Sequence, residues 1–306
     1  MHYSVMRQEV IENLKIKKDG IYVDGTIGLA GHSSLILKNI PEGHLYGFDQ
    51  DDFAIEKSDE LLKNIGNNYT LIHDNFCNMK ERLEEIGVEK VDGILLDLGV
   101  SSPQIDDGSR GFSFMKDATL DMRMDKRNKL TAKKIVNEYD YDKLLDVFYT
   151  YGEERFSKII ARKIINYRKD KEIDSTLELV DIIKSSVPVK YFIDNHPERQ
   201  IFQALRIEVN SELKVLESVL PDAINLLNKG GRLCVITFHS LEDRAVKNVF
   251  NTAQGICTCP KDLPYCVCGA KQLGKIINKK PIIATENEQK ENTRSKSAKL
   301  RIFEKF

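Results

Sequence analysis

The stretch that decides the fold reads Val23-Asp24-Gly25-Thr26-Ile27-Gly28-Leu29-Ala30-Gly31-His32-Ser33. A short apolar run, residues 21–24, precedes a glycine-rich turn, and a helix is expected to begin near Ser33. Glycines let backbone N–H groups approach a ligand closely, and the helix directs its N-terminus at the same place. The spacing is G-x-x-G-x-x-G rather than G-x-G-x-x-G, so a plain tight turn between strand and helix stays open. We predict a strand–turn–helix unit with a candidate ligand site.

Outward from this turn, the first hundred residues alternate between strand-like and helix-like patterns. Further strands are expected at 45–49, 69–72 and 91–97, and helices at 5–14, 33–38, 53–65 and 79–86. The nearly continuous apolar character of 91–97 is typical of a strand buried on both faces. This alternation predicts an α/β fold with a doubly wound sheet of βαβ units.

The pattern changes after Pro103. Residues 106–212 contain long helical stretches and no convincing strand, with helices expected at 132–139, 144–149, 155–168, 177–185 and 199–227. Gly230-Gly231 is interpreted as a helix stop, and strands resume at 232–238 and 299–303. We therefore predict a sheet domain of residues 1–105 and 213–306 that carries an inserted helical domain, residues 106–212.

The composition is that of a soluble globular protein. Among 306 residues, 41% are hydrophobic and 30% charged, with a net charge of −1, which excludes disordered and strongly basic chains. Apolar runs stay far below the ~20 residues that cross a bilayer, and no signal-peptide pattern opens the chain, so a cytoplasmic location is expected. From Lys271 onward, ten basic residues face four glutamates. This segment either meets phosphate or forms a solvated, partly flexible tail.

Asp49 ends the second expected strand, about 20 residues after the glycine turn. In a doubly wound sheet, an acidic side chain at this position accepts hydrogen bonds from ribose hydroxyls. The turn and Asp49 together predict a ligand that contains a nucleoside.

The fourth strand is followed by Ser102-Pro103-Gln104, which resembles a truncated form of the Asp/Asn/Ser-Pro-Pro-aromatic loop of amino-group methyltransferases. Gln104 replaces the second proline, and no aromatic residue follows at once. The blocks that carry the wider resemblance are Asp24-Gly25-Thr26, Gly31-His32-Ser33, residues 93–104, Arg110-Gly111-Phe112-Ser113-Phe114, residues 120–125, residues 151–156, residues 202–206 and residues 238–244. In this order, over nearly the whole chain, they resemble the bacterial 16S ribosomal RNA cytosine-N4 methyltransferase family.

The resemblance implies a class I methyltransferase fold, S-adenosylmethionine as methyl donor, and a decoding-centre cytidine of 16S rRNA in the small ribosomal subunit as acceptor. Neither DNA nor a membrane is an expected partner. The implied cofactor contacts are Ala30, Gly31, His32, Asp49, Phe76 near the adenine, Asp97 and Gln104. Ala30 stands where many members have glycine, so its methyl group requires a backbone conformation open to L-residues.

Methyl transfer from a sulfonium is an in-line displacement, so the protein mainly has to position the acceptor amine. Ser102, Pro103 and His239 are the candidate catalytic residues. Ser102 or a nearby carbonyl is expected to accept hydrogen bonds from the amine, with a turn and helix cap at Ser101-Ser102 as the alternative. His239 either contacts the target base or merely closes a turn before a helix capped by Ser240 with Asp243.

Arg110, Phe112, Phe114, Arg123 and Arg127 form a basic and aromatic cluster suited to a splayed base and its phosphates, although core packing would also explain both phenylalanines. After Arg199, an apolar helical stripe is accompanied by a polar one of Gln203, Arg206 and Asn210, which is expected to face a cleft or solvent.

Four cysteines follow the pattern Cys257-x-Cys259-x₆-Cys266-x-Cys268. Two such pairs facing each other would supply four thiolates to a structural zinc ion, and reduced surface thiols are the alternative. No catalytic metal is expected.

The family resemblance favours an enzyme that methylates cytosine N4 in small-subunit rRNA. A nucleoside-type pocket and a basic surface would also occur in an RNA-binding protein without chemistry. A methyltransferase that acts on DNA or on a small amine is a third possibility.

Overall fold

The computed structural model describes residues 4–257, 259–267 and 270–306, and only the backbone of Ser102. The chain forms two compact units. One comprises Met1–Gly99 with Leu213–Phe306, and the other comprises Val100–Glu212. Each unit is described by itself below.

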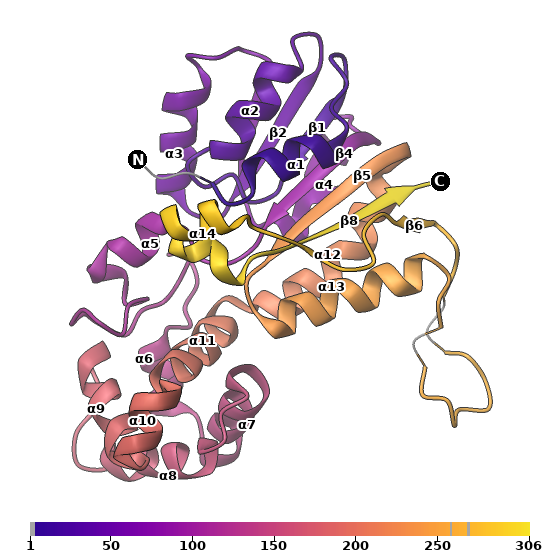
Figure 1. Cartoon of the computed structure of the whole chain (residues 1–306). Helices are drawn as coiled ribbons and strands as arrows, with labels where there is room; N and C mark the ends of the chain where they lie inside the picture. The colour runs from indigo at the N-terminus through magenta and orange to yellow at the C-terminus, as the bar shows by residue number, and fades with distance from the viewer. Residues whose placement is uncertain (1–3, 258, 268–269) are drawn as a thin grey trace. The chain divides into compact units, whose positions relative to one another are not determined.

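The first unit is built on one mixed sheet (Figure 1). Its strands are β1 (Ile21–Asp24), β2 (His44–Asp49), β3 (Tyr69–His73), β4 (Val91–Asp97), β5 (Leu227–Thr237), β6 (Gly274–Ile276), β7 (Ile282–Ile283) and β8 (Lys299–Lys305). Their order is β3-β2-β1-β4-β5-β8-β6, and β7 pairs with β8. Strands β1 to β5 run parallel, whereas β8 is antiparallel to β5. The predicted α/β class with a doubly wound sheet is confirmed.

Helices cover both faces of this sheet. They are α1 (Arg7–Leu14), α2 (Gly31–Asn39), α3 (Asp52–Leu62), α4 (Met79–Glu85), α12 (Glu212–Leu226), α13 (Ser240–Ala253) and α14 (Glu286–Glu291), with short 3-10 turns η1 (Phe76–Asn78) and η3 (Thr293–Ser297). Side chains of α4, α12 and α13 share one hydrophobic core, and those of α1, α2 and α3 share the other. Ile94 and Leu96 of β4 enter the first core and Leu95 the second. The prediction that this strand is buried on both faces is confirmed.

The interpretation of Gly230-Gly231 as a helix stop is wrong. Helix α12 ends at Leu226, and both glycines lie within β5. The pairing of β4 with β5 jumps from Val91↔Leu227 to Gly93↔Arg232, so the glycines lie in a bulge opposite Asp92. Gly230 has a positive φ of 77°, and a side chain on Gly231 would crowd the carbonyl oxygen of Asp92.

The basic C-terminal segment is folded into the sheet rather than forming a flexible tail. Arg301 of β8 makes a two-pronged ion pair with Asp243, with Nε–Oδ1 and Nη2–Oδ2 distances of 2.6 and 3.0 Å. Glu304 accepts from Arg232, Lys15 and Lys275 at 2.9 to 3.1 Å. Part of the positive charge counted in the sequence is therefore neutralised within the unit.

The second unit is helical (Figure 1). It contains α5 (Ser102–Asp106), η2 (Gly108–Arg110), α6 (Ala132–Glu138), α7 (Tyr141–Gly152), α8 (Ser157–Tyr167), α9 (Thr176–Ser186), α10 (Val189–Asn195) and α11 (Pro197–Asn210). Throughout its backbone, which is described in full, the only β pairing is the isolated bridge Thr119↔Ser175. The single helix predicted over 199–227 is instead two, because Ser211 turns left-handed with φ 51°. Helix α10 was not predicted.

None of the helices in the described part of the chain is both long and apolar enough to cross a membrane.

Candidate active site

Hydrogen bonds connect the carboxyl ends of β1 and β4. Asp24, at the end of β1, is 1% exposed and accepts from the Ser33 hydroxyl at 2.6 Å and from the Thr26 backbone N–H at 3.1 Å. The Thr26 hydroxyl accepts from the Asp97 backbone N–H at 2.7 Å. Strand order reverses between β1 and β4, and ligands of doubly wound sheets bind outside the carboxyl ends at such a point. The glycine turn is thus fixed at the edge where a ligand is expected.

Asp49 holds the same turn from the end of β2. Its Oδ2 accepts from the Gly28 backbone N–H and its Oδ1 from that of Asp51, both at 2.9 Å. Burial raises the pKa of Asp49 to about 6, although these two backbone hydrogen bonds lower it. Each carboxylate oxygen has a further acceptor position, so Asp49 can hold the turn and still accept from a ligand diol.

His32 and Asp97 face each other at this edge. The His32 side chain is 4% exposed in the first turn of α2, and its Nε2 lies 3.5 Å from Asp97 Oδ2. Both ring nitrogens of His32 and Oδ1 of Asp97 are buried without a hydrogen-bond partner among the described residues. Buried polar atoms in native proteins are nearly always satisfied. These three atoms are therefore available to a polar ligand.

Ala30 and Gly31 form the junction between the turn and α2. Ala30 has φ 56° and ψ 29°, the left-handed conformation that an L-residue adopts at a cost of about 1–2 kcal/mol. The backbone at Ala30 therefore meets the requirement of a conformation open to L-residues only in the small left-handed region. Its methyl group is fully buried in the core shared with α1 and α3, which offsets part of the strain. A side chain on Gly31 would overlap the Ser4 hydroxyl, which would then have to move.

Phe76 lies in η1, immediately after β3 and Asp74-Asn75. Its ring is partly buried against the core that β4 shares with α4. A side chain added at Gly25 would come within 2.5 Å of Leu96 and 3.3 Å of Phe76. The backbone of the glycine turn thus packs directly against Phe76, which the structure brings to the same edge as Asp49 and Asp97.

Pro103 and Gln104 belong to the second unit, in the first turn of α5. Gln104 is 6% exposed, and its Oε1 accepts from the Ser101 backbone N–H at 3.2 Å. Ser101 is the N-cap residue of α5, so the alternative of a helix cap is confirmed at Ser101. The side chain of Ser102 lies outside the described residues. The contacts of Ser102 and Pro103 with an acceptor, and of Gln104 with a cofactor, stay predictions.

His239 is the N-cap residue of α13. Its Nδ1 accepts from the Glu242 backbone N–H at 3.4 Å, while Glu242 Oε2 accepts from the backbone N–H groups of Phe238 and His239. The predicted cap of Ser240 with Asp243 is therefore wrong by one residue, because Ser240 is already helical and Asp243 pairs with Arg301. His239 Nε2 lies 3.1 Å from Glu242 Oε1. The helix orients this ring, and its contact with a target base stays a prediction.

The predicted phosphate-binding arginines are engaged within the second unit. Arg123 pairs with Asp121 at 2.7 and 2.8 Å, and its Nη1 donates to the carbonyls of Lys126 and Asn128. Arg127 pairs with Asp125 at 2.9 Å. Arg110 donates to the Arg123 carbonyl at 2.9 Å. These contacts hold the loop between η2 and α6 in place, and binding of phosphate by the same arginines stays a prediction.

The two phenylalanines of that cluster are core residues. Phe112 is 9% exposed, and Phe114 packs edge-to-face on Phe202 with ring centroids 5.8 Å apart. Core packing therefore explains both rings.

The polar stripe of α11 is likewise structural. Gln203 donates to the Tyr151 carbonyl at 3.0 Å, and Arg206 pairs with Glu212 at 2.8 Å. Asn210 donates to the Met122 carbonyl and accepts from the Met124 backbone N–H, both at 2.8 Å.

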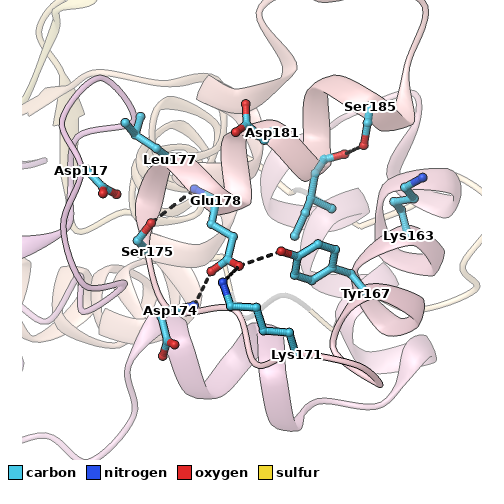
Figure 2. A pocket seen from close by; sticks show the side chains of 11 residues that line it. Asp117, Lys163, Tyr167, Lys171, Asp174, Ser175, Leu177, Glu178, Asp181 and Ser185 are labelled. Atoms are coloured by element: carbon cyan, nitrogen blue, oxygen red, sulfur yellow. Dashed lines mark hydrogen bonds and ion pairs between the residues drawn. The ribbon is translucent and has the colours of Figure 1, made fainter.

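An open hollow of about 740 Å³ lies on the second unit between α8 and α9, and sequence reasoning did not find it (Figure 2). Glu178 accepts at its centre from the Tyr167 hydroxyl and from Lys171, both at 2.7 Å. Burial opposes ionisation, but these bonds and one from the Asp174 backbone lower the pKa of Glu178 to about 2. Four acidic side chains and two lysines line the hollow, so its charge does not suit a phosphate.

The entire chain, residues 1–306, matches the model of the MraW methylase family. The chain belongs to this family. The protein named ribosomal RNA small subunit methyltransferase H of Lachnospira eligens is 52% identical over 307 residues, covering 100% of this chain and 98% of that protein. Its namesakes from Acetivibrio thermocellus and Clostridium botulinum strain Loch Maree are 53% and 50% identical, each over 100% of this chain and 99% of the relative. The crystal structure of a putative rRNA methylase from Clostridium thermocellum aligns over 100% of both chains, at 14% identity and a TM-score of 0.45.

Family membership confirms the resemblance drawn from the sequence. The match to the MraW methylase family extends over residues 1–306 and is not confined to one motif.

Proposed function

We propose that this protein transfers a methyl group from S-adenosylmethionine to the exocyclic N4 of a decoding-centre cytidine in 16S rRNA of the small ribosomal subunit. Membership of the MraW methylase family and full-length identity of about half to proteins named ribosomal RNA small subunit methyltransferase H support this reaction. The donor site is supported by His32 and Asp97, because both ring nitrogens of His32 and Oδ1 of Asp97 are buried without a hydrogen-bond partner among the described residues.

The donor, when bound, supplies an electrophilic methyl group on a sulfonium. In the proposed site, Asp49 accepts hydrogen bonds from the ribose hydroxyls, as acidic residues at the end of the second strand do in doubly wound sheets. Asp97 accepts from the ammonium group of the methionine part, because it has a buried oxygen without a partner among the described residues. Phe76 contacts the adenine, and the backbone at Ala30 and Gly31 lies against the donor.

The chain's own contribution to the chemistry is mainly position. A displacement at the methyl carbon requires the attacking nitrogen ~3–3.5 Å away and in line with the bond that breaks. Ser102 and Pro103 are proposed to contact the acceptor amine, so that hydrogen bonds from its protons favour the pyramidal transition state over the planar ground state. His239 is proposed to contact the target base. No acid–base residue is required to generate the nucleophile: the nitrogen lone pair attacks, the bond from sulfur to the methyl carbon breaks to leave S-adenosylhomocysteine, and the methylated nitrogen then loses one proton to solvent.

We further propose that the chain has two domains. Residues 1–105 and 213–306 form the methyltransferase domain, and the inserted residues 106–212 form the domain that recognises the substrate. A structured RNA substrate is consistent with so large a helical insertion. Because the small ribosomal subunit is a cytoplasmic particle, the protein is proposed to act in the cytoplasm.

The test uses small subunits from cells that lack the protein, together with isotope-labelled S-adenosylmethionine and mass-spectrometric mapping of modified cytidines. We expect one N4-methylated cytidine in 16S rRNA. Asp97→Asn should abolish donor binding, whereas Asp92→Asn at the opposite end of β4 should leave it intact. Subunit binding without methyl transfer would favour the RNA-binding alternative, and transfer to DNA or to a small amine alone would overturn the proposed substrate.

A further inference from the structure

A long loop connects α13 to β6 in the first unit (Figure 1). Residues 254–273 show no helix or strand among those described, and loops of this length without secondary structure are uncommon unless they are functional or disordered. The base of the loop is closed by backbone contacts. The Leu273 N–H donates to the Ala253 carbonyl at 2.7 Å, and Gln254 and Gln272 form an isolated antiparallel β-bridge.

Three cysteines gather within this loop. The Sγ atoms of Cys257, Cys259 and Cys266 all lie within 4.8 Å of one another. Cys257 and Cys266 are nine residues apart in the sequence, and their Sγ atoms are 3.6 Å apart. A disulfide requires about 2.05 Å, whereas two thiolates on one tetrahedral zinc ion, each with a Zn–S distance of ~2.3 Å, lie ~3.8 Å apart. The observed separation matches shared metal ligands.

A backbone hydrogen bond supports the same assignment. The Val267 N–H donates to the Cys259 Sγ at 3.3 Å. Donation to sulfur stabilises the thiolate form, which is the form that binds metal. The contact also joins the two cysteine-bearing arms of the loop, so the ligand set is held by the backbone and not only by side-chain rotamers.

The loop 254–273 has few buried side chains that would stabilise it. Tyr265 and Val267 are 81% and 77% exposed, so the loop gains little stability from burying its own apolar side chains. A metal ion that joins Cys257 and Cys259 to Cys266 would close the loop near its tip, as the backbone closes it at its base.

We propose that Cys257, Cys259 and Cys266 bind one Zn²⁺ ion as a structural clasp of the loop 254–273. The site is distinct from the proposed donor site and takes no part in methyl transfer. A thiolate set of this kind, with no carboxylate or histidine among the three ligands, is typical of structural zinc. A fourth ligand is water or another side chain. Cys268, which follows Cys266 at the spacing of Cys257 and Cys259, lies outside the described residues.

The test uses the reduced, metal-free full chain and titrates Co²⁺ as a spectroscopic probe, followed by Zn²⁺. We expect one equivalent to produce thiolate-to-cobalt charge-transfer absorption and the intense visible bands of tetrahedral cobalt, both removed by Zn²⁺. Cys257→Ser, Cys259→Ser and Cys266→Ser should each weaken zinc binding by more than ~100-fold, since even outer-shell changes cost ~10–100-fold. Cys77→Ser, a matched change outside the loop, should leave binding unchanged.

A second measurement keeps the proposal testable if a variant folds poorly. Zn²⁺ should slow tryptic cleavage at Lys261 in the wild type, with cleavage sites mapped by mass spectrometry, and should give no protection in Cys259→Ser. Absence of a tetrahedral cobalt spectrum, or the same spectrum from the triple variant, would overturn the proposal. Formation of a Cys257–Cys266 disulfide in a chain that binds no metal would overturn it as well.

Discussion

The backbone N–H of Gly28 donates a 2.9 Å hydrogen bond to Oδ2 of Asp49, which couples the glycine turn after β1 to the end of β2. The residue proposed to bind the donor ribose therefore also shapes the turn that approaches the donor. A change at Asp49 is expected to act on both.

Asp49→Ala should weaken S-adenosylmethionine binding by more than ~1.4 kcal/mol, or tenfold, because a hydrogen bond to a charged group is worth about 1.5–3 kcal/mol. Isothermal titration calorimetry measures this, and circular dichroism checks the fold. Asp52→Ala, at an exposed position in the first turn of α3, is the matched control. Unchanged affinity in a folded Asp49→Ala protein would remove Asp49 from the site.

Donor affinity should depend on pH through Asp49. Its pKa is raised to about 6 by burial, and the ionised carboxylate is the better acceptor for ribose hydroxyls. Affinity is therefore expected to be full well above pH 6 and to fall as the pH drops through about 6, a trend that Asp49→Asn should flatten.

The free energy of unfolding should also depend on the ionisation of Asp49, but it should fall with rising pH where donor affinity rises. Because the folded pKa is raised above the unfolded value, the native state binds more protons, and stability is lost as the pH rises from about 4 to about 6. Denaturant titrations of the wild type and Asp49→Asn over this range should diverge, and parallel curves would contradict the assignment.

Ser102→Ala should lower kcat and leave donor affinity nearly unchanged, because its proposed contact is with the acceptor amine. Single-turnover methylation of small subunits, together with donor titration, separates the two quantities. Ser101→Ala provides the neighbouring control, since Ser101 is the N-cap residue of α5 and its loss should act on stability. An equal drop in rate and donor affinity for Ser102→Ala would place that residue in the donor site.

Arg123→Ala should destabilise the protein by about 1–2 kcal/mol, because it breaks the two-pronged pair with Asp121 and removes the donor to two backbone carbonyls of the same loop. A double-mutant cycle with Asp121→Ala, read by denaturant unfolding, should show coupling between the two side chains. If Arg123→Ala weakened RNA binding in a salt-dependent way and left stability unchanged, Arg123 would be assigned to RNA binding instead.

Assembled small subunits should be methylated much faster than a short RNA of the same target sequence, since only the former engages surfaces beyond the donor site.

Lys279, Lys280, Lys290 and Lys296 are exposed and lie in the basic C-terminal segment. Lys279→Ala with Lys280→Ala should reduce the salt dependence of subunit binding by about 0.7–0.9 in log–log slope for each phosphate that is no longer neutralised. Lys57→Ala, at a partly exposed lysine paired with Glu60 in the first unit, should leave the salt dependence unchanged. A flat salt response and equal rates on both substrates would contradict an extended RNA surface.

Local sequence patterns predict six of the eight strands of the sheet, all but the short β6 and β7, and the edge where the donor site is proposed. The strand at Ile21–Asp24, the glycine turn and the acidic end of β2 were all predicted at their observed positions. Their signals are local, because apolar runs, glycine spacing and the residue that ends a strand are read within about ten neighbouring residues. Family membership was also predicted, since its motifs extend over nearly the whole chain.

Long-range contacts in the folded chain set which polar groups are already engaged. Gly230 and Gly231 look like a helix stop until β4 pairs with β5 around a bulge at Asp92. Arg123 looks available for phosphate until the fold of its loop brings two carbonyls and Asp121 to its guanidinium. The sulfurs of Cys257 and Cys266 come together only when the loop closes. Composition shows which charges and ligands a chain contains, but their partners depend on contacts between residues distant along the backbone, which local pattern does not encode.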